Sequence, residues 1–549
     1  ASDAWFLAAV AGSIVQNELH DVDFLASRTT GFEELRDLLC RIDVSEMEQR
    51  CGLEAGAVST LAADFAASES SSIMFDLGVE QTPFSTLVSW LIRLNLALTG
   101  NLGRGGNLFV EGFGPPSRSA NRFDEPERTL AAGIQAIRAL GNFMMFSPTL
   151  VPEEVLLDHP ERLRAVVVEG SNPLLSFTDA GRWREAIDRL DLLVVIDPAF
   201  TETARLADYV LPTPCGYEKW ELAMFPKRYP EIDVQLRPPL VPGPAEALPE
   251  AEIYMRLCEA MGLVEPAPES LLAYNEDHSA AARQAFLMEA MTLATEAAAR
   301  GIDVETQVTA WAYRCIGGHF AAPSLVAVWL LCQMNATERL DSVLRTLGED
   351  WRERTPGEIG EELFARIMAH PESVEVARQD PATNLEDNIG YDDGLIRLAP
   401  APMVEELQRA LNDGDDEDKD YPIVLAGGLR TRWTANTIQR DPAWRRGKGP
   451  HCPVNISAED AQSLGLRQGD RVRVETRRAS LELPAVVDEN LRSGHAWIPN
   501  GFGTLYSDSI EGPVEVVGVN CNELMDISER DPITGIPHTK ALRCRISAA

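Results

Sequence analysis

Residues 165–220 have the sequence AVVVEGSNPLLSFTDAGRWREAIDRLDLLVVIDPAFTETARLADYVLPTPCGYEKW, and this stretch decides the fold of the chain. An apolar run at 166–168 is followed by a Gly-Ser-Asn-Pro turn and a helical span. A second apolar run, Leu192–Ile196, ends at Asp197, and a third, Tyr209–Leu211, ends at a proline. This alternation of strand, turn and helix is typical of a parallel sheet. The sequence therefore predicts an α/β fold with parallel-sheet nucleotide-binding domains.

Two groups of residues follow the predicted strands directly. In parallel sheets the ligand binds beyond the carboxyl ends of the strands, where 170–172 and Asp197 are expected to lie. Free backbone N–H groups in such a turn bind phosphate, and a carboxylate accepts paired N–H groups from a base such as guanine. A buried nucleotide is the first hypothesis. The glycine-rich loop at 99–107 (TGNLGRGGN) also permits close backbone approach to a ligand, although surface loops share this composition.

The composition places the chain among ordinary globular proteins. Its 549 residues are enough for several domains, and it is 45% hydrophobic and 24% charged. No apolar stretch is long and uncharged enough to span a bilayer. Nine cysteines include no C-x-x-C pair, which argues against a zinc or local iron–sulfur motif and favours reduced thiols in a cytoplasmic protein.

The net charge of −36 is unevenly distributed along the chain. From Tyr421 onward, 16 Lys and Arg balance 15 Asp and Glu, so residues 1–420 carry the acidic charge. An acidic body of this kind repels nucleic acid and anionic membranes, so we expect neither as a partner. Between Arg430 and Lys448 six basic residues accompany one acid. This concentration is either surface scatter or a site for a phosphorylated ligand, and the other signals favour the second.

The patterns divide the chain into four parts. We predict an α/β region at 1–265, an all-helical insertion with its connection at 266–400, an acidic linker at 401–420 and a β-barrel domain at 421–549. The insertion shows helical spacing at 271–299, 304–312, 324–334, 338–347 and 358–369. The barrel strands are expected at 422–426, 471–475, 481–487 and 496–498, with Ser457 as the cap of a helix between them. A buried strand is expected at 71–78 and a helix at 130–140.

Four passages of the sequence carry a family resemblance. They are LTGNLGRGG (98–106), VEGSNPLL (168–175), VVIDPAFTETARLADYVLPTP (194–214) and the tail 421–546, which includes VNISAEDAQSLGLRQGDRVRVET, AWIPNGFG and NELMDISERDPITGIPHTK. In order and content they resemble the molybdopterin oxidoreductases of the dimethyl-sulfoxide-reductase type, which include formate dehydrogenases and nitrate reductases. The likeness covers most of 1–265 and 421–549 and leaves out the helical insertion.

The resemblance implies a bis(molybdopterin guanine dinucleotide) cofactor that holds molybdenum or tungsten. Near one guanosine end, the matched positions are Gly170, Ser171, Asn172 and Asp197, and Thr203 and Asp208 lie in the same motif. In the tail, the cofactor-facing matches are Arg430, Thr431, Thr434, Asn436, Thr437, Asn500, Asn522, His538 and Lys540. The side-chain chemistry agrees, because Arg and Thr donate to phosphate oxygens and Asn pairs with the amide-like edges of a pterin. Any one of these residues could instead fill a turn.

The sequence also departs from the family pattern. Members normally begin with a cysteine-rich iron–sulfur domain, followed by the region that supplies the metal ligand, and neither has a match here. A 4Fe-4S cluster is therefore expected only in the missing amino-terminal part, and the expected partners are a small-molecule substrate and either that portion or an electron-transfer subunit. No catalytic residue or metal ligand is assigned in this chain. Cys215 follows a strand, but it is not at the family's ligand position and is interpreted as a structural thiol.

The resemblance implies an oxidoreductase that carries out two-electron chemistry on a small substrate such as formate or nitrate. This chain would be the cofactor-binding carboxy-terminal portion, incomplete for catalysis by itself. A second hypothesis is a non-catalytic scaffold that has lost the metal cofactor, as in the large subunit of respiratory complex I. A third is a plain nucleotide-binding module that uses only 165–220, and it leaves the tail motifs unexplained.

Overall fold

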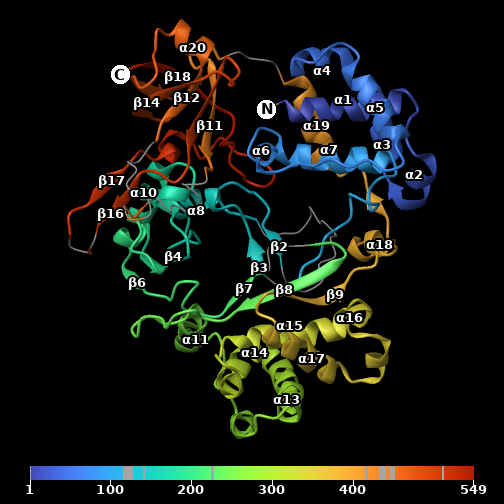
Figure 1. Ribbon diagram of the computed structural model, residues 1–549, viewed down its shortest axis with the longest axis vertical. Coiled ribbons are helices and arrows are strands. Elements are labelled where there is room, and N and C mark those ends of the chain that lie inside the picture. Colours follow the sequence, from blue (N-terminus) through green and yellow to red (C-terminus); the bar gives the residue numbers. More distant parts are fainter. Residues whose placement is uncertain are drawn as a thin grey trace.

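The computed structural model describes residues 2–114, 128–139, 143–223, 228–413, 418–431, 440–441, 443, 452–507, 509 and 512–549. Figure 1 shows four regions arranged around a centre: amino-terminal helices, an α/β unit, a helical lobe and a carboxy-terminal barrel. Among the described residues no helix combines the length and apolar character needed to cross a membrane.

The amino-terminal region is a bundle around the apolar helix α1 (Asp3–Gln16). Its other helices are α2 (Val22–Arg28), α3 (Phe32–Cys40), α4 (Val44–Cys51), α5 (Ala57–Ala67), α6 (Leu77–Glu80) and α7 (Ser85–Leu98). The short strand β1 (Thr29–Thr30) pairs with β10 (Ile396–Arg397). Helix α19 (Ala401–Asn412) also packs here, with Leu407 buried and the Trp5 indole donating to the Ala410 carbonyl at 2.8 Å. Part of the predicted acidic linker is thus an amphipathic helix in this core.

The strand expected at 71–78 is not formed. The Ser71 N–H donates to Asn101 Oδ1 at 2.9 Å, and Asn107 Nδ2 donates to the Ser71 carbonyl at 2.6 Å. Side chains of the glycine-rich loop therefore take the hydrogen bonds that a neighbouring strand would need, and Met74 is left 98% exposed. That loop packs against protein at Gly100, where an added Cβ would lie 2.3 Å from Asp21 Oδ2.

The α/β unit has the predicted parallel sheet, in the order β4-β5-β6. Its strands are β4 (Ala165–Glu169), β5 (Leu192–Ile196) and β6 (Tyr209–Leu211). Helices α8 (Val151–Leu156), α9 (Pro173–Ser176) and α10 (Ala180–Arg189) accompany it. The prediction of a helix at 130–140 is wrong. Thr129 and Gly133, at φ +64°, close a turn, and β2 (Ile137–Ala139) pairs with β3 (Phe143–Met145).

The helical lobe lies between two paired strands. Strand β8 (Glu231–Arg237) is antiparallel to both β7 (Glu221–Ala223) and β9 (Val374–Arg378). Between β8 and β9 the chain forms α11 (Glu250–Met261), α12 (Glu269–Leu272), α13 (Ala280–Ala298), α14 (Val304–Cys315), α15 (Leu325–Glu338), α16 (Leu340–Leu347) and α17 (Pro356–Ala369). Trp311 and Trp329 are buried in this lobe. After β9, α18 (Asn384–Asn388) returns the chain to the amino-terminal core.

The carboxy-terminal region is a closed six-stranded barrel in the order β11-β15-β12-β14-β13-β18. Its strands are β11 (Ile423–Leu429), β12 (Val454–Ser457), β13 (Arg471–Glu475), β14 (Ser480–Asp488), β15 (His495–Pro499) and β18 (Leu542–Ala548). The predicted cap is confirmed, because Ser457 Oγ accepts from the Asp460 N–H at 3.0 Å at the start of α20 (Ala458–Ser463). A hairpin of β16 (Thr504–Tyr506) and β17 (Glu515–Val517) projects toward the α/β unit (Figure 1).

Candidate site at the edge between sheet and barrel

Gly170 and Asp197 lie together beyond the carboxyl ends of β4 and β5. The Gly170 N–H donates to the Ile196 carbonyl at 2.9 Å, and its φ of +53° is a left-handed conformation that favours glycine. A Cβ added at Gly170 would meet no atom of the described residues within 4 Å, and Gly170 is exposed, so the space beside this turn is open. Ser171 follows, half-buried. The turn thus offers exposed backbone next to a free volume, as a ligand site requires.

Asp197 is buried, with 9% of its surface exposed. Its Oδ1 accepts from the Ala199 N–H at 2.7 Å, and no described residue donates to Oδ2. Burial raises the pKa of this carboxyl above its ordinary value, against the opposing effects of the Ala199 N–H and the Arg440 charge. A desolvated carboxylate with a free oxygen suits a ligand that brings its own N–H donors.

Asn172 and Thr203 bind each other and leave no side-chain polar group of Asn172 free. The Thr203 N–H and hydroxyl donate to Asn172 Oδ1 at 3.2 and 2.8 Å. Asn172 Nδ2 donates to Glu202 Oε2 at 2.6 Å. Both predicted residues therefore shape the turn from within the protein.

Asp208 lies at the other end of the sheet, before β6 begins. Its Oδ2 accepts from the Leu193 N–H at 2.7 Å, and its own N–H donates to the Leu193 carbonyl at 2.9 Å. Asp208 thus extends the pairing of β5 and β6 and does not meet Gly170 or Asp197. The two acids of the matched motif are separated by the length of the sheet.

Asn522 joins the barrel to the α/β unit. Its Nδ2 donates to the Leu175 carbonyl at 2.6 Å, and its own carbonyl accepts from the Asp179 N–H at 3.1 Å. Asn520 Nδ2 reaches the Leu174 carbonyl at 2.9 Å in the same way. Asn500, which follows β15, accepts from the next residue's N–H at 2.7 Å through its Oδ1. The side-chain bonds of Asn500 and Asn522 thus go to backbone within the protein.

His538 and Lys540 have polar groups suited to an acceptor ligand. His538 Nε2 is buried without a hydrogen-bond partner among the described residues, and burial lowers the pKa of its imidazole. Lys540 Nζ donates to the Gly427 carbonyl at 2.7 Å. Burial, with a further contribution from the Arg430 charge, lowers the pKa of Lys540 against the effect of Cys521. Two neighbouring cations, one of them desolvated, favour an anion such as phosphate.

The remaining predicted residues divide into two groups. Arg430 and Thr431 continue directly from β11, and Arg430 is exposed. Thr434, Asn436 and Thr437 lie outside the described residues.

Asp531 joins the tail to helix α7, and the sequence analysis did not identify it. Only 1% of its surface is exposed, and it accepts from the Thr86 N–H at 3.0 Å, the Thr86 hydroxyl at 2.8 Å and the Ser85 hydroxyl at 3.2 Å. Helix α7 has no cap from the residue that precedes it, so the tail supplies one. Burial raises the pKa of Asp531, but these and other backbone donors outweigh it and lower the pKa overall. In the sequence, the pair Asp531-Pro532 indicated only a turn.

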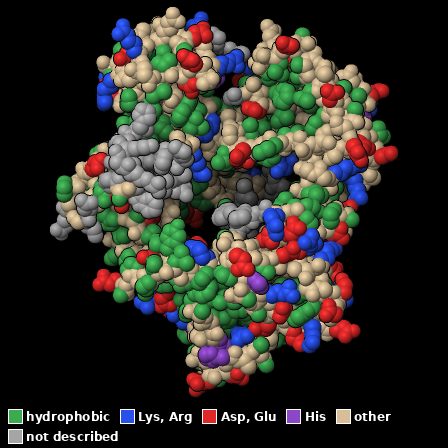
Figure 2. Space-filling view, viewed as in Figure 1, with side chains coloured by type: hydrophobic (Ala, Val, Ile, Leu, Met, Phe, Trp, Pro, Cys, Tyr) green, Lys and Arg blue, Asp and Glu red, His purple; other side chains and the backbone are tan. Residues whose placement is uncertain are grey.

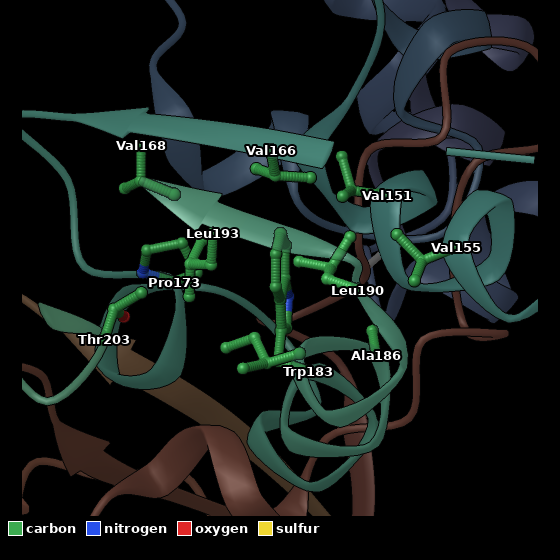
Figure 3. A pocket seen from close by; sticks show the side chains of 11 residues that line it. Val151, Val155, Val166, Val168, Pro173, Trp183, Ala186, Leu190, Leu193 and Thr203 are labelled. Atoms are coloured by element: carbon green, nitrogen blue, oxygen red, sulfur yellow. The ribbon is translucent and has the colours of Figure 1, made fainter. Parts of the chain in front are cut away.

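A small apolar cavity lies on the helix-covered face of the same sheet (Figure 3). Its volume is about 10 Å³, and its wall includes Val166, Leu193 and Trp183. A space of this size holds one water at most, and a nearly apolar wall gives that water no partners. This cavity is a packing gap and not a ligand site.

The described residues hold no group of three or more His, Cys, Asp or Glu arranged to bind a metal ion. Cys215, the cysteine weighed as a ligand, is half-buried, and its N–H donates to Glu218 Oε2 at 2.8 Å in a local turn. The candidate site is a polar edge between the β4-β5-β6 sheet and the barrel.

The face of the molecule that is seen in Figure 2 has a hollow at its centre, between the four regions.

Two family models match this chain. The model described as Molybdopterin oxidoreductase matches residues 53–260, and the one described as Molydopterin dinucleotide binding domain matches residues 425–543. These ranges contain the α/β unit and nearly all of the barrel.

Curated proteins are similar over most of this chain. The F420-dependent formate dehydrogenase 2 subunit alpha of Methanococcus maripaludis is 25% identical over 90% of this chain and 62% of its own length. The trimethylamine-N-oxide reductase of Haemophilus influenzae is 24% identical over 94% of this chain and 60% of its own. The chain thus spans about three-fifths of the length of these relatives. The solved acetylene hydratase from Pelobacter acetylenicus superposes with a TM-score of 0.66 over 100% of this chain and 70% of its own, at 17% identity, which shows a shared fold.

Proposed function

The chain belongs to the molybdopterin oxidoreductase family, and from that premise we propose that it is the cofactor-binding portion of a molybdenum or tungsten oxidoreductase. The cofactor in this proposal is bis(molybdopterin guanine dinucleotide). The observation that carries the proposal is the open space beside Gly170, adjoined by the buried carboxylate of Asp197.

Residues beyond the end of the sheet and in the tail of the chain together fit a dinucleotide with its phosphates. Asp197 has an oxygen without a described donor, which suits the paired N–H groups of guanine. Lys540 and Arg430 supply positive charge for phosphate, and His538 Nε2 is a buried group without a described partner. In this proposal the residues bind and orient the dinucleotide, and its buried end is kept from water. The bound group itself would supply the two-electron chemistry at its metal.

The substrate class proposed is a small oxidisable or reducible molecule, with formate favoured. Support comes from the relative that is named an F420-dependent formate dehydrogenase subunit. Nitrate, the other substrate expected from the resemblance, is not in the names of the two relatives compared. A 4Fe-4S cluster and the metal ligand are proposed to come from an amino-terminal portion or an electron-transfer subunit.

The scaffold hypothesis makes a different prediction about the purified protein. A scaffold has no use for a desolvated lysine beside a second cation, so the pair of Lys540 and Arg430 favours the cofactor-binding function. Metal analysis by mass spectrometry, with a fluorescence assay for oxidised pterin, separates the two. We expect pterin in the purified chain, with molybdenum or tungsten when the partner portion is present.

Replacement of Asp197 by Ala tests the proposed site directly. We expect Asp197→Ala to lose most of the bound pterin, because the guanine end loses its carboxylate. Unchanged pterin content in a folded Asp197→Ala protein would contradict the assignment of this residue. Absence of both pterin and metal from the wild-type protein, after expression with the partner portion, would contradict the function itself.

A further inference from the structure

Glu202 connects three segments that are distant in the sequence. It is buried, with 7% of its surface exposed. Its Oε2 accepts from Asn172 Nδ2 at 2.6 Å and from the Arg440 guanidinium, and its Oε1 accepts from the Leu505 N–H in β16. One carboxylate therefore contacts the turn after β4, the Arg440 side chain and the hairpin of the barrel.

Arg440 completes this arrangement from the barrel side. Its Nη1 donates to the Leu505 carbonyl at 3.0 Å, while Nη2 pairs with Glu202. Together the two side chains satisfy the N–H and the carbonyl of the same residue, as a neighbouring strand would. The side chains of Arg440 and Glu202 are only 18% and 8% exposed, so solvent screens the pair weakly.

Glu202 also fixes the orientation of the Asn172 amide. A carboxylate only accepts, so the Asn172 nitrogen must face Glu202 and its oxygen must face the donors of Thr203. The backbone of 170–172, which borders the open space, is positioned as a result. Although burial raises the pKa of Glu202, the donors from Arg440 and Leu505 outweigh it and lower that pKa, which keeps the acceptor ionised.

We propose that Glu202 and Arg440 are positioning residues that hold the 170–172 turn and the barrel in the register that binds the guanine dinucleotide. This inference rests on the proposed function and goes further. It assigns part of the affinity for the ligand to Glu202 and Arg440, which support the 170–172 turn and do not themselves face the ligand. Outer partners that orient ligand-binding groups at metal sites change affinity by roughly 10- to 100-fold, and we expect an effect of that size here.

The test uses the 549-residue chain freed of cofactor, with guanosine 5′-diphosphate as the probe and calorimetric titration as the measurement. We expect Glu202→Gln to raise the Kd for this nucleotide by roughly 10- to 100-fold. Arg440→Lys is the second variant, because a lysine keeps the charge but cannot reach Glu202 and the Leu505 carbonyl together. The double variant should bind no worse than the weaker single variant, since the residues act as one unit.

Glu523→Gln is the matched control. Glu523 pairs with Arg184 at 2.6 Å and joins the same two regions, but it does not contact Asn172. This variant should change the Kd by less than about twofold, whatever its effect on Tm. A Glu202→Gln or Arg440→Lys protein that binds the nucleotide as tightly as wild type would overturn the inference, as would an equal loss in Glu523→Gln. Wild-type protein that binds neither the nucleotide nor pterin would overturn the proposed function as well.

Discussion

The two ends of the β4-β5-β6 sheet carry the same kind of residue in opposite settings. At the carboxyl end, Asp197 is buried beside open space and its pKa is raised. At the amino end, Asp208 is exposed and accepts from the backbone of β5. Both acids belong to one short motif that resembles a cofactor-binding segment. The difference teaches that position relative to the end of a strand separates an acid that can meet a ligand from one that extends a sheet.

The ends also differ in how many segments they join. The carboxyl end is bound to the barrel through Glu202 and Asn522, whereas the bonds of Asp208 stay within its own sheet. Substitutions at the carboxyl end should therefore affect both stability and ligand binding, and substitutions at the amino end should affect stability alone.

The largest expected loss of stability follows from Asn172→Ala. This change removes the bond to Glu202 and leaves the buried Thr203 hydroxyl and N–H without their acceptor. We expect the free energy of unfolding to fall by about 3 kcal/mol, because buried polar groups without partners cost more than the bonds contributed. Denaturant unfolding measures this. A loss below about 1 kcal/mol would show that the carboxyl end is not the more tightly bound end.

Asp197→Asn should give a smaller effect that depends on pH. The raised pKa of Asp197 means that its protonated form stabilises the fold, fully at low pH, and that this contribution is lost as pH rises through the folded-state pKa. The wild type should therefore lose stability relative to Asp197→Asn as pH rises above the unfolded-state pKa, as thermal unfolding at several pH values would measure.

Asp531→Asn provides the control of opposite sign for that measurement. The pKa of Asp531 is lowered, so its contribution is present above the unfolded-state pKa and is lost as pH falls. The wild type should exceed Asp531→Asn in stability near neutral pH, and this advantage should shrink in acid. Parallel pH profiles for the two variants would contradict the burial argument for Asp197.

Asp208→Ala should have the smallest effect. It removes one partly buried hydrogen bond to the Leu193 N–H, so we expect a loss of about 1 kcal/mol in unfolding free energy. Pterin content should stay at the wild-type level, because Asp208 is distant from Gly170. Loss of pterin in this variant would remove the contrast between the two ends and return Asp208 to the binding site.

Much of the fold followed from local pattern. Apolar runs between turn residues predicted β4, β5 and β6, and the helical spacing at 304–312 predicted α14. The spacing of apolar residues in the sequence directly indicates which face of these elements is buried. The segment 71–78 has a similar apolar run, yet its backbone bonds to Asn101 and Asn107 from a later loop. Only tertiary contact decides such a case.

By itself the sequence determined the parallel sheet, the barrel and the positions of Gly170 and Asp197 after strands, because these depend on periodicity along the chain, and its motifs carried the family resemblance. The tertiary structure decided which polar residues meet. In the folded chain the Asn172 amide is hydrogen-bonded to Glu202 and Thr203. Arg440 pairs with Glu202 although 238 positions separate them in the sequence. Periodicity in the sequence does not indicate which distant residues pair, because a buried carboxylate can pair with any guanidinium that lies near it.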